Sequence, residues 1–144
     1  MESNRTYSNA LDLLKSVGLR PTRQRLSLAR LLFERGDRHV TAEQLHSEAL
    51  AARVRVSLAT VYNTLHQFTS AGLLNELVVD SGRSYFDTNT GHHHHFFHEN
   101  TSTLEDIPGD QVRIDSLPAP AEGREISRVE VIIRVRDEAP RTSD

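Results

Sequence analysis

The sequence predicts an α+β protein, in which an N-terminal winged helix-turn-helix precedes a small α/β dimerisation domain. Apolar residues recur at helical spacing through four segments of the first half and then give way to short alternating runs typical of strands. The histidines are just as uneven, because five of the eight lie between His92 and His98. We expect the winged helix over residues 1–86, the second domain over 87–137 and a disordered tail over 138–144.

The composition excludes several classes of protein. A chain of 144 residues suits one domain or two small ones, and 37% hydrophobic residues predict a modest core that subunit association would supplement. The absence of cysteine excludes disulfides, thiolate zinc sites, iron–sulfur clusters and cysteine nucleophiles. No apolar run approaches about 18 residues and the first residues are polar, so we expect a cytoplasmic, soluble protein with no membrane partner.

Each of the four helices is predicted by an apolar face and by a signal at one end. The first covers residues 6–17 and stops at Gly18, and the second begins after Thr22 and ends before Gly36. The third begins after Thr41, with Gln44 completing a capping box, and turns Leu45, Ala49 and Leu50 inward. The fourth begins after Ser57 and ends at Gly72.

The second half is predicted to be mostly strands. Residues 73–80 and 83–88 flank Ser81-Gly82 and form a hairpin, the wing. Residues 93–97 and 103–107 form two further strands, and a short helix is expected over 111–116. The alternating run at 128–136 predicts a long strand whose apolar face needs a partner sheet, which a second copy of the chain would supply.

Helices three and four have the pattern of a DNA-binding helix-turn-helix. Residues 1–80 carry ten basic against eight acidic side chains, whereas residues 81–144 carry seven against twelve, which permits a basic face on the first half. The groups expected to contact duplex DNA lie at the starts of helices two and four: Arg20, Arg23, Arg25, Ser57, Thr60, Tyr62 and Asn63, with Thr64 on the same face. Arg53 and Arg55 precede helix four and could contact the DNA backbone. The alternative is a helical bundle whose polar surface serves solubility.

The histidine run indicates a metal or haem site. On a strand, His93 and His95 point to one face, and His92 and His94 point to the other. Two imidazoles at this spacing need two or three further ligands for zinc, iron or manganese. Candidate ligands are carboxylates near the run and one histidine of the first domain: Asp87, Glu105, Asp106 and His39. The alternatives are an exposed polar loop and the remnant of an expression tag.

Five segments occur in an order that resembles the ferric uptake regulator family. They are GLRPTRQRLSLARLLF, HVTAEQLHSEA, SLATVYNTLHQFTSAGLL, SYFDT and the histidine-rich strand, and together they cover about residues 10–107. The absence of cysteine, the HHHHFF run and the ending ISRVEVIIRVR are similar to the haem-responsive iron response regulator branch.

The resemblance implies a homodimeric, iron-responsive transcriptional regulator, mainly a repressor and not an enzyme, that binds operator DNA under iron limitation and is released by haem. It implies that Arg20 contacts the minor groove and Tyr62 a thymine. Its regulatory site for a divalent ion (Fe, Mn or Zn) maps onto His39, Asp87, His93, His95 and Asp106.

Further sites and partners follow from the same resemblance. An incomplete second metal site would use His92 and His94. Haem would bind within His93, His94 and His95, with His46 and His66 as weaker candidates, and a haem-delivering enzyme would be a further partner.

Three alternatives remain open. A ferrous, manganese, zinc or peroxide sensor of the same family is the nearest. A His/Asp-ligated metallohydrolase is another, although the chain lacks HExxH. A metal-buffering protein is the third, but it would need no recognition helix flanked by arginines.

Overall fold

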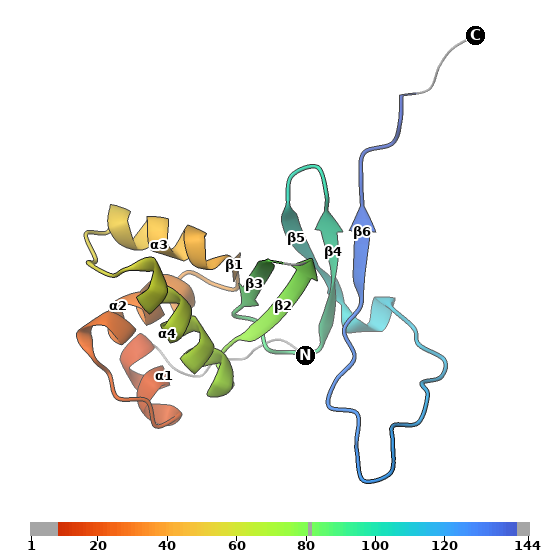
Figure 1. Ribbon diagram of the computed structural model, residues 1–144, viewed down its shortest axis with the longest axis horizontal. Coiled ribbons are helices and arrows are strands. Elements are labelled where there is room, and N and C mark those ends of the chain that lie inside the picture. Colours follow the sequence, from red (N-terminus) through yellow and green to blue (C-terminus); the bar gives the residue numbers. More distant parts are fainter. Residues whose placement is uncertain (1–8, 81, 141–144) are drawn as a thin grey trace. The chain divides into compact units, whose positions relative to one another are not determined.

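The computed structural model describes residues 9–80 and 82–140. The chain divides into two compact units, which meet in the sequence between Gly91 and His92; we call the first unit 1 and the second unit 2. In the described residues, unit 1 contains four α-helices and three strands, and unit 2 contains three strands and one 3-10 helix (Figure 1). The α+β fold class is confirmed. The predicted domain limits stay predictions, and residues 141–144 of the expected tail lie outside the described part.

Three helices of unit 1 begin after the caps that the sequence predicts, and the first begins after Asn9, a cap that the sequence did not predict. The four helices are α1 (Ala10–Ser16), α2 (Arg23–Phe33), α3 (Ala42–Ala51) and α4 (Leu58–Ser70). In each case the preceding side chain accepts a hydrogen bond from a backbone N–H of the first turn, and the four caps are Asn9, Thr22, Thr41 and Ser57. The predicted capping box between Thr41 and Gln44 is present. The prediction that the first helix runs unbroken from residue 6 is wrong, because Asn9 has an extended backbone and caps α1; residues 6–8 themselves lie outside the described part.

Two helices end at the predicted glycines. Gly18 and Gly72 have φ values of +75° and +83°, a left-handed conformation that glycine adopts without strain. The residue after each donates its N–H back to the last turn, Leu19 to the Leu14 carbonyl and Leu73 to the Phe68 carbonyl. By contrast, α2 already ends at Phe33, before the predicted stop at Gly36.

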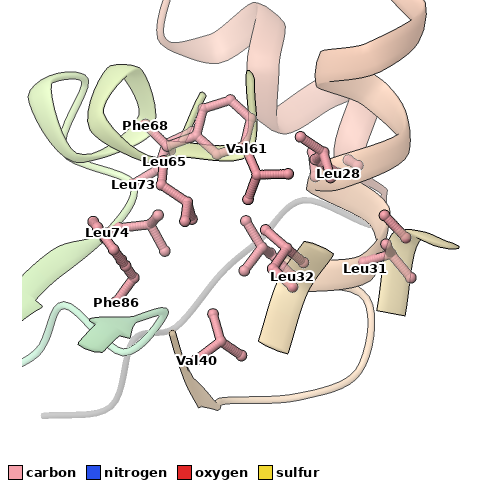
Figure 2. Packing of buried hydrophobic residues seen from close by; sticks show 14 of the residues in the cluster. Leu28, Leu31, Leu32, Val40, Val61, Leu65, Phe68, Leu73, Leu74 and Phe86 are labelled. Carbon is pink, nitrogen blue, oxygen red and sulfur yellow. The ribbon is translucent and has the colours of Figure 1, made fainter. Parts of the chain in front are cut away.

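The core of unit 1 contains buried residues of all four helices and of the strand region. Figure 2 shows the packed side chains Leu28, Leu31, Leu32, Val40, Val61, Leu65, Phe68, Leu73, Leu74 and Phe86. The prediction that Leu50 faces inward is wrong, because its side chain is 57% exposed. The buried face of α3 consists of Ala42, Leu45 and Ala49, and Leu50 lies one residue, about 100° of rotation, beyond it.

A three-stranded antiparallel sheet completes unit 1. The predicted hairpin is present as β2 (Asn75–Asp80) and β3 (Arg83–Asp87), and a two-residue strand β1 (His39–Val40) pairs with the other edge of β3. The register places both His39 and Asn75 opposite Asp87. The order of four helices followed by this hairpin is the one expected of a winged helix-turn-helix. The sequence did not predict β1, since two residues carry no periodicity.

Unit 2 is built on a second three-stranded sheet in the order β5-β4-β6. The predicted strands are present as β4 (His93–His98) and β5 (Thr103–Pro108), which pair antiparallel with His95 opposite Asp106. The third strand, β6 (Ile132–Val135), runs parallel to β4 and pairs with its second half.

Two expectations for unit 2 are wrong. The short helix expected over 111–116 is absent: a single 3-10 turn, η1 (Gly109–Gln111), ends where it was expected to begin, and the chain then runs without helix or strand to β6 (Figure 1). Prolines and a glycine in this stretch oppose regular structure. The predicted strand over 128–136 is limited to Ile132–Val135, because it pairs only with His95–His98 of β4. In the described residues, no helix is long and apolar enough to cross a membrane.

Candidate functional site

Unit 2 carries a compact cluster of two imidazoles and one carboxylate. His93 and His95 lie two residues apart on β4, so their rings share one face of the strand, with centroids 4.5 Å apart. Asp106 reaches the same place from β5. Its Oδ1 atom lies 3.5 Å from the Nε2 atom of His93 and 3.4 Å from that of His95. We call these three side chains the HHD cluster.

Unit 1 contains one imidazole and one carboxylate that lie close together. The Nε2 atom of His39 lies 3.3 Å from the Oδ2 atom of Asp87, because β1 and β3 place the two residues opposite each other. The other carboxylate oxygen, Oδ1, accepts a hydrogen bond of 2.9 Å from the backbone N–H of Asn89, which fixes the orientation of the carboxylate. We call these two side chains the HD pair.

Both groups have the chemistry of a divalent metal site. Neutral imidazole nitrogens and carboxylate oxygens suit iron, manganese and zinc, and the HHD cluster offers one ligand atom from each residue within 4.8 Å of the others. Asp87, His93 and His95 are buried. Buried imidazoles arranged around a carboxylate are expected to be paired or to hold a cation.

His94 lies on the opposite face of β4, and the ring of His92, which directly precedes the strand, lies 5.2 Å from the ring of His94 between centroids. The backbone N–H of Val131 donates to the Nδ1 atom of His94 at 3.1 Å, so the neutral ring carries its hydrogen on Nε2. Burial lowers the pKa of His94, and the positive charges of the neighbouring histidines lower this pKa further. The ring therefore helps to attach the segment before β6 to β4. The predicted second metal site at His92 and His94 would break this bond, and it stays a prediction.

The candidate DNA-contacting residues lie at the starts of α2 and α4. Arg20, Arg25, Thr60 and Asn63 line one hollow of about 410 Å³, together with Thr22, Gln24, Thr64 and Gln67. Arg20 and Arg23 are exposed, as direct contact with DNA requires. Arg25 instead donates to the carbonyl oxygen of Arg20 at 3.0 Å and to Oε1 of Gln67 at 3.1 Å. In this structure Arg25 thus connects the start of α2 to α4.

On α4 the predicted contact residues divide into two groups. Thr60 and Asn63 face the hollow, whereas the Ser57 hydroxyl caps the helix and also donates to Oγ1 of Thr60 at 3.0 Å. Thr64 was expected to face outward but is only 5% exposed, so that expectation is wrong. It lies one turn after Thr60 on α4, among the buried residues of that helix.

Tyr62 is held by a residue that the sequence did not single out. Its hydroxyl donates to Oε2 of Glu43 on α3 at 2.8 Å. This hydrogen bond raises the pKa of Tyr62, and burial and the negative charge of Glu43 raise the pKa further. No sequence signal could have found this pair, because the two residues are 19 positions apart on different helices.

The sequence is similar to that of a known protein family over most of its length. The sequence profile of the "Ferric uptake regulator family" matches residues 16–134. The chain belongs to the ferric uptake regulator family. Its curated relatives include ferric uptake regulation proteins. The protein from Bordetella parapertussis is 37% identical over 92 residues, which are 63% of this chain and 66% of the relative. The protein from Cupriavidus metallidurans is 38% identical over 81 residues, 56% and 57% of the two chains. The matched part therefore spans less than two thirds of these relatives.

Solved structures of ferric uptake regulators resemble the chain over most of its length. The Pseudomonas aeruginosa protein with manganese has a TM-score of 0.68 and 26% identity, covering 90% of this chain and 98% of that one. The Francisella tularensis protein with iron has a TM-score of 0.67 and 26% identity, covering 84% and 93%. The family is named for regulators, which fits the expectation that this member is not an enzyme.

The remaining histidines of this family member have protein partners. The Nε2 atom of His46 lies 3.1 Å from the Val56 carbonyl oxygen, and that of His98 lies 2.8 Å from Oε1 of Glu105. The exposed His66 ring packs near Phe86, with centroids 5.8 Å apart. The weaker haem candidates, His46 and His66, thus already take part in the packing of unit 1.

Proposed function

We propose that this member of the ferric uptake regulator family is a metal-dependent transcriptional regulator, mainly a repressor, that binds duplex DNA as a homodimer. The observation that carries the proposal is the pair of preassembled ligand groups, the HHD cluster in unit 2 and the HD pair in unit 1. Neither group alone offers the four or more ligands that a tightly held ion needs.

One ion would join the two groups. Only five residues separate Asp87 from His93, and a fully extended chain of that length spans about 20 Å, so both groups can reach the same ion. A metal held by both units would fix the orientation of each DNA-binding unit on its dimerisation unit. In a dimer the two α4 helices would then acquire the spacing of successive major grooves, about 34–36 Å. Because linkage is reciprocal, DNA would in turn raise the affinity for the metal.

The exposed apolar side chains of unit 2 support the proposed dimer. Several large apolar side chains there are more than a third exposed: Ile114, Leu117, Ile126 and Ile133. Exposed apolar groups collected in so small a unit favour association. Sedimentation of the purified chain should give the mass of a dimer at micromolar concentration, and a monomer would contradict this part of the proposal.

The test of metal dependence is DNA binding with and without the ion. Fragments of the source genome that bind the Mn²⁺-loaded chain would first be selected, and their affinity then measured by fluorescence anisotropy. EDTA and His93→Ala should each abolish selective binding. His98→Ala is the matched control, because His98 lies on the same strand but on the other face and outside the HHD cluster. Selective binding that survives both EDTA and His93→Ala would refute the proposal.

We propose in addition that haem releases the protein from DNA. This response to haem is supported by the histidine run, because haem iron that binds His93 or His95 would remove a ligand from the HHD cluster and so weaken DNA binding. Whether the natural signal is haem, iron, manganese, zinc or peroxide is decided by titration of the DNA complex with each. Haem at saturation that leaves operator affinity unchanged would exclude the haem-responsive role, and the metal-dependent role would stand.

A further inference from the structure

The turn between α3 and α4 contains an arginine in a backbone conformation that favours glycine. Arg53 has a φ of +60°, in the left-handed region. The residues around it form the usual hydrogen bonds of a helix end, since Arg53 N–H donates to the Leu50 carbonyl and Val54 N–H donates to the Ala49 carbonyl at 2.8 Å. At the equivalent positions after α1 and α4 the chain uses Gly18 and Gly72. A long charged side chain therefore occupies a position whose backbone conformation favours glycine.

The turn is also held rigidly by neighbouring side chains. Gln24 of α2 donates from Nε2 to the Arg55 carbonyl at 3.3 Å, and His46 of α3 lies with its Nε2 atom 3.1 Å from the Val56 carbonyl oxygen. Ser57, which follows directly, caps α4. Two helices and a cap thus fix the backbone on both sides of Arg55.

The two arginine side chains on this turn are exposed and their charges are not paired within the described residues. Arg53 and Arg55 are both exposed. Across residues 9–80 and 82–140, neither guanidinium group has a hydrogen bond or an ion pair, whereas Arg25 and Arg38 of the same unit are both engaged. Two free guanidinium groups at alternate positions of a rigid turn, next to the helix that carries Thr60 and Asn63, match the way proteins contact a nucleic-acid backbone.

We propose that Arg53 and Arg55 are phosphate contacts that hold duplex DNA against α4, and that Arg53 occupies a left-handed position for this purpose. This inference rests on the proposed DNA-binding function. These contacts carry no sequence information, so they set the strength and the salt dependence of binding rather than the choice of operator.

The experiment measures the affinity of the full-length, Mn²⁺-loaded chain for a 25-base-pair duplex of mixed sequence, by anisotropy over a series of KCl concentrations. Each lost phosphate contact should reduce the slope of log K against log[salt] by about 0.9 and lower the affinity at 0.1 M salt by about eightfold. We expect this of Arg53→Gly and of Arg55→Gln, with both effects adding in the double variant. Arg124→Gln is the control, because it removes the same charge from an exposed residue of unit 2 and should bind with the wild-type slope.

A thermal melt of the same variants separates binding from folding. Arg53→Gly should melt no lower than the wild type, because glycine suits the left-handed position. Binding by Arg53→Gly and Arg55→Gln with the slope of Arg124→Gln would overturn the inference while leaving DNA binding intact. A wild-type chain that shows no Mn²⁺-dependent binding to any duplex would overturn the proposed function, and this inference with it.

Discussion

Ser57 immediately precedes α4, and its hydroxyl caps the first turn of that helix. It accepts the backbone N–H of Thr60 at 3.1 Å and donates to the Thr60 hydroxyl at 3.0 Å. Replacement of a serine cap by alanine typically lowers the free energy of unfolding by about 1 kcal/mol, whereas glycine lowers it by only a few tenths. In a domain of roughly 60–100 residues, 1 kcal/mol corresponds to about 4–8 °C in Tm.

Ser57→Ala should therefore melt about 4–8 °C below the wild type, and Ser57→Gly only about 1–3 °C below it. Far-ultraviolet circular dichroism of the metal-free chain, which follows the helices of unit 1, measures both. Ser57→Gly should also keep near wild-type DNA affinity, because the hydroxyl is already occupied. Equal destabilisation by alanine and glycine would contradict the capping role of Ser57. A Ser57→Gly variant that melts normally but loses DNA binding would show that the hydroxyl contacts DNA.

Three further variants test other contacts. Glu43→Gln should lower the raised pKa of Tyr62 towards 10, because it removes the carboxylate that accepts the phenolic hydrogen. Alkaline titration of tyrosinate absorbance measures this pKa, and Tyr62→Phe identifies the signal of Tyr62. A pKa that is the same in Glu43→Gln and the wild type would contradict the contact. Leu65→Ala empties a fully buried position and should lower the free energy of unfolding by about 2–5 kcal/mol in urea denaturation; a loss below about 1 kcal/mol would mean that the core is not packed as described. Glu48→Gln breaks the bidentate ion pair with Arg38 and should lower the free energy of unfolding by about 1–3 kcal/mol. In an Arg38→Met background the same substitution should have little effect on the free energy of unfolding.

The features that the sequence predicts correctly are local ones. Thr22, Thr41 and Ser57 each bind a backbone N–H three residues ahead, and Gly18 and Gly72 each adopt a left-handed conformation. These preferences act within one turn of chain, so they can be recognised without knowledge of the tertiary fold. The alternation of His93 and His95 on one face of β4 is local in the same sense.

The features that the sequence misses depend on partners far along the chain. The strand predicted over 128–136 is short because β4 limits the pairing, and no pattern in the strand itself contains that limit. Tyr62 meets Glu43, and Arg25 meets Gln67, only because helices pack across one another. His94 resembles its neighbours in the sequence, yet a backbone N–H from residue 131 gives it a different role.

We propose that one divalent ion is bound by residues of both units, and calorimetric titration with Mn²⁺ tests this proposal most directly. The wild type and His98→Ala should each bind one tightly held Mn²⁺ per chain. His39→Ala in unit 1 and His93→Ala in unit 2 should each weaken the same site by about 100-fold or more, because loss of even an outer-shell partner typically costs 10–100-fold. A His39→Ala chain that binds Mn²⁺ as tightly as the wild type, while His93→Ala does not, would confine the ion to unit 2 and contradict the coupling.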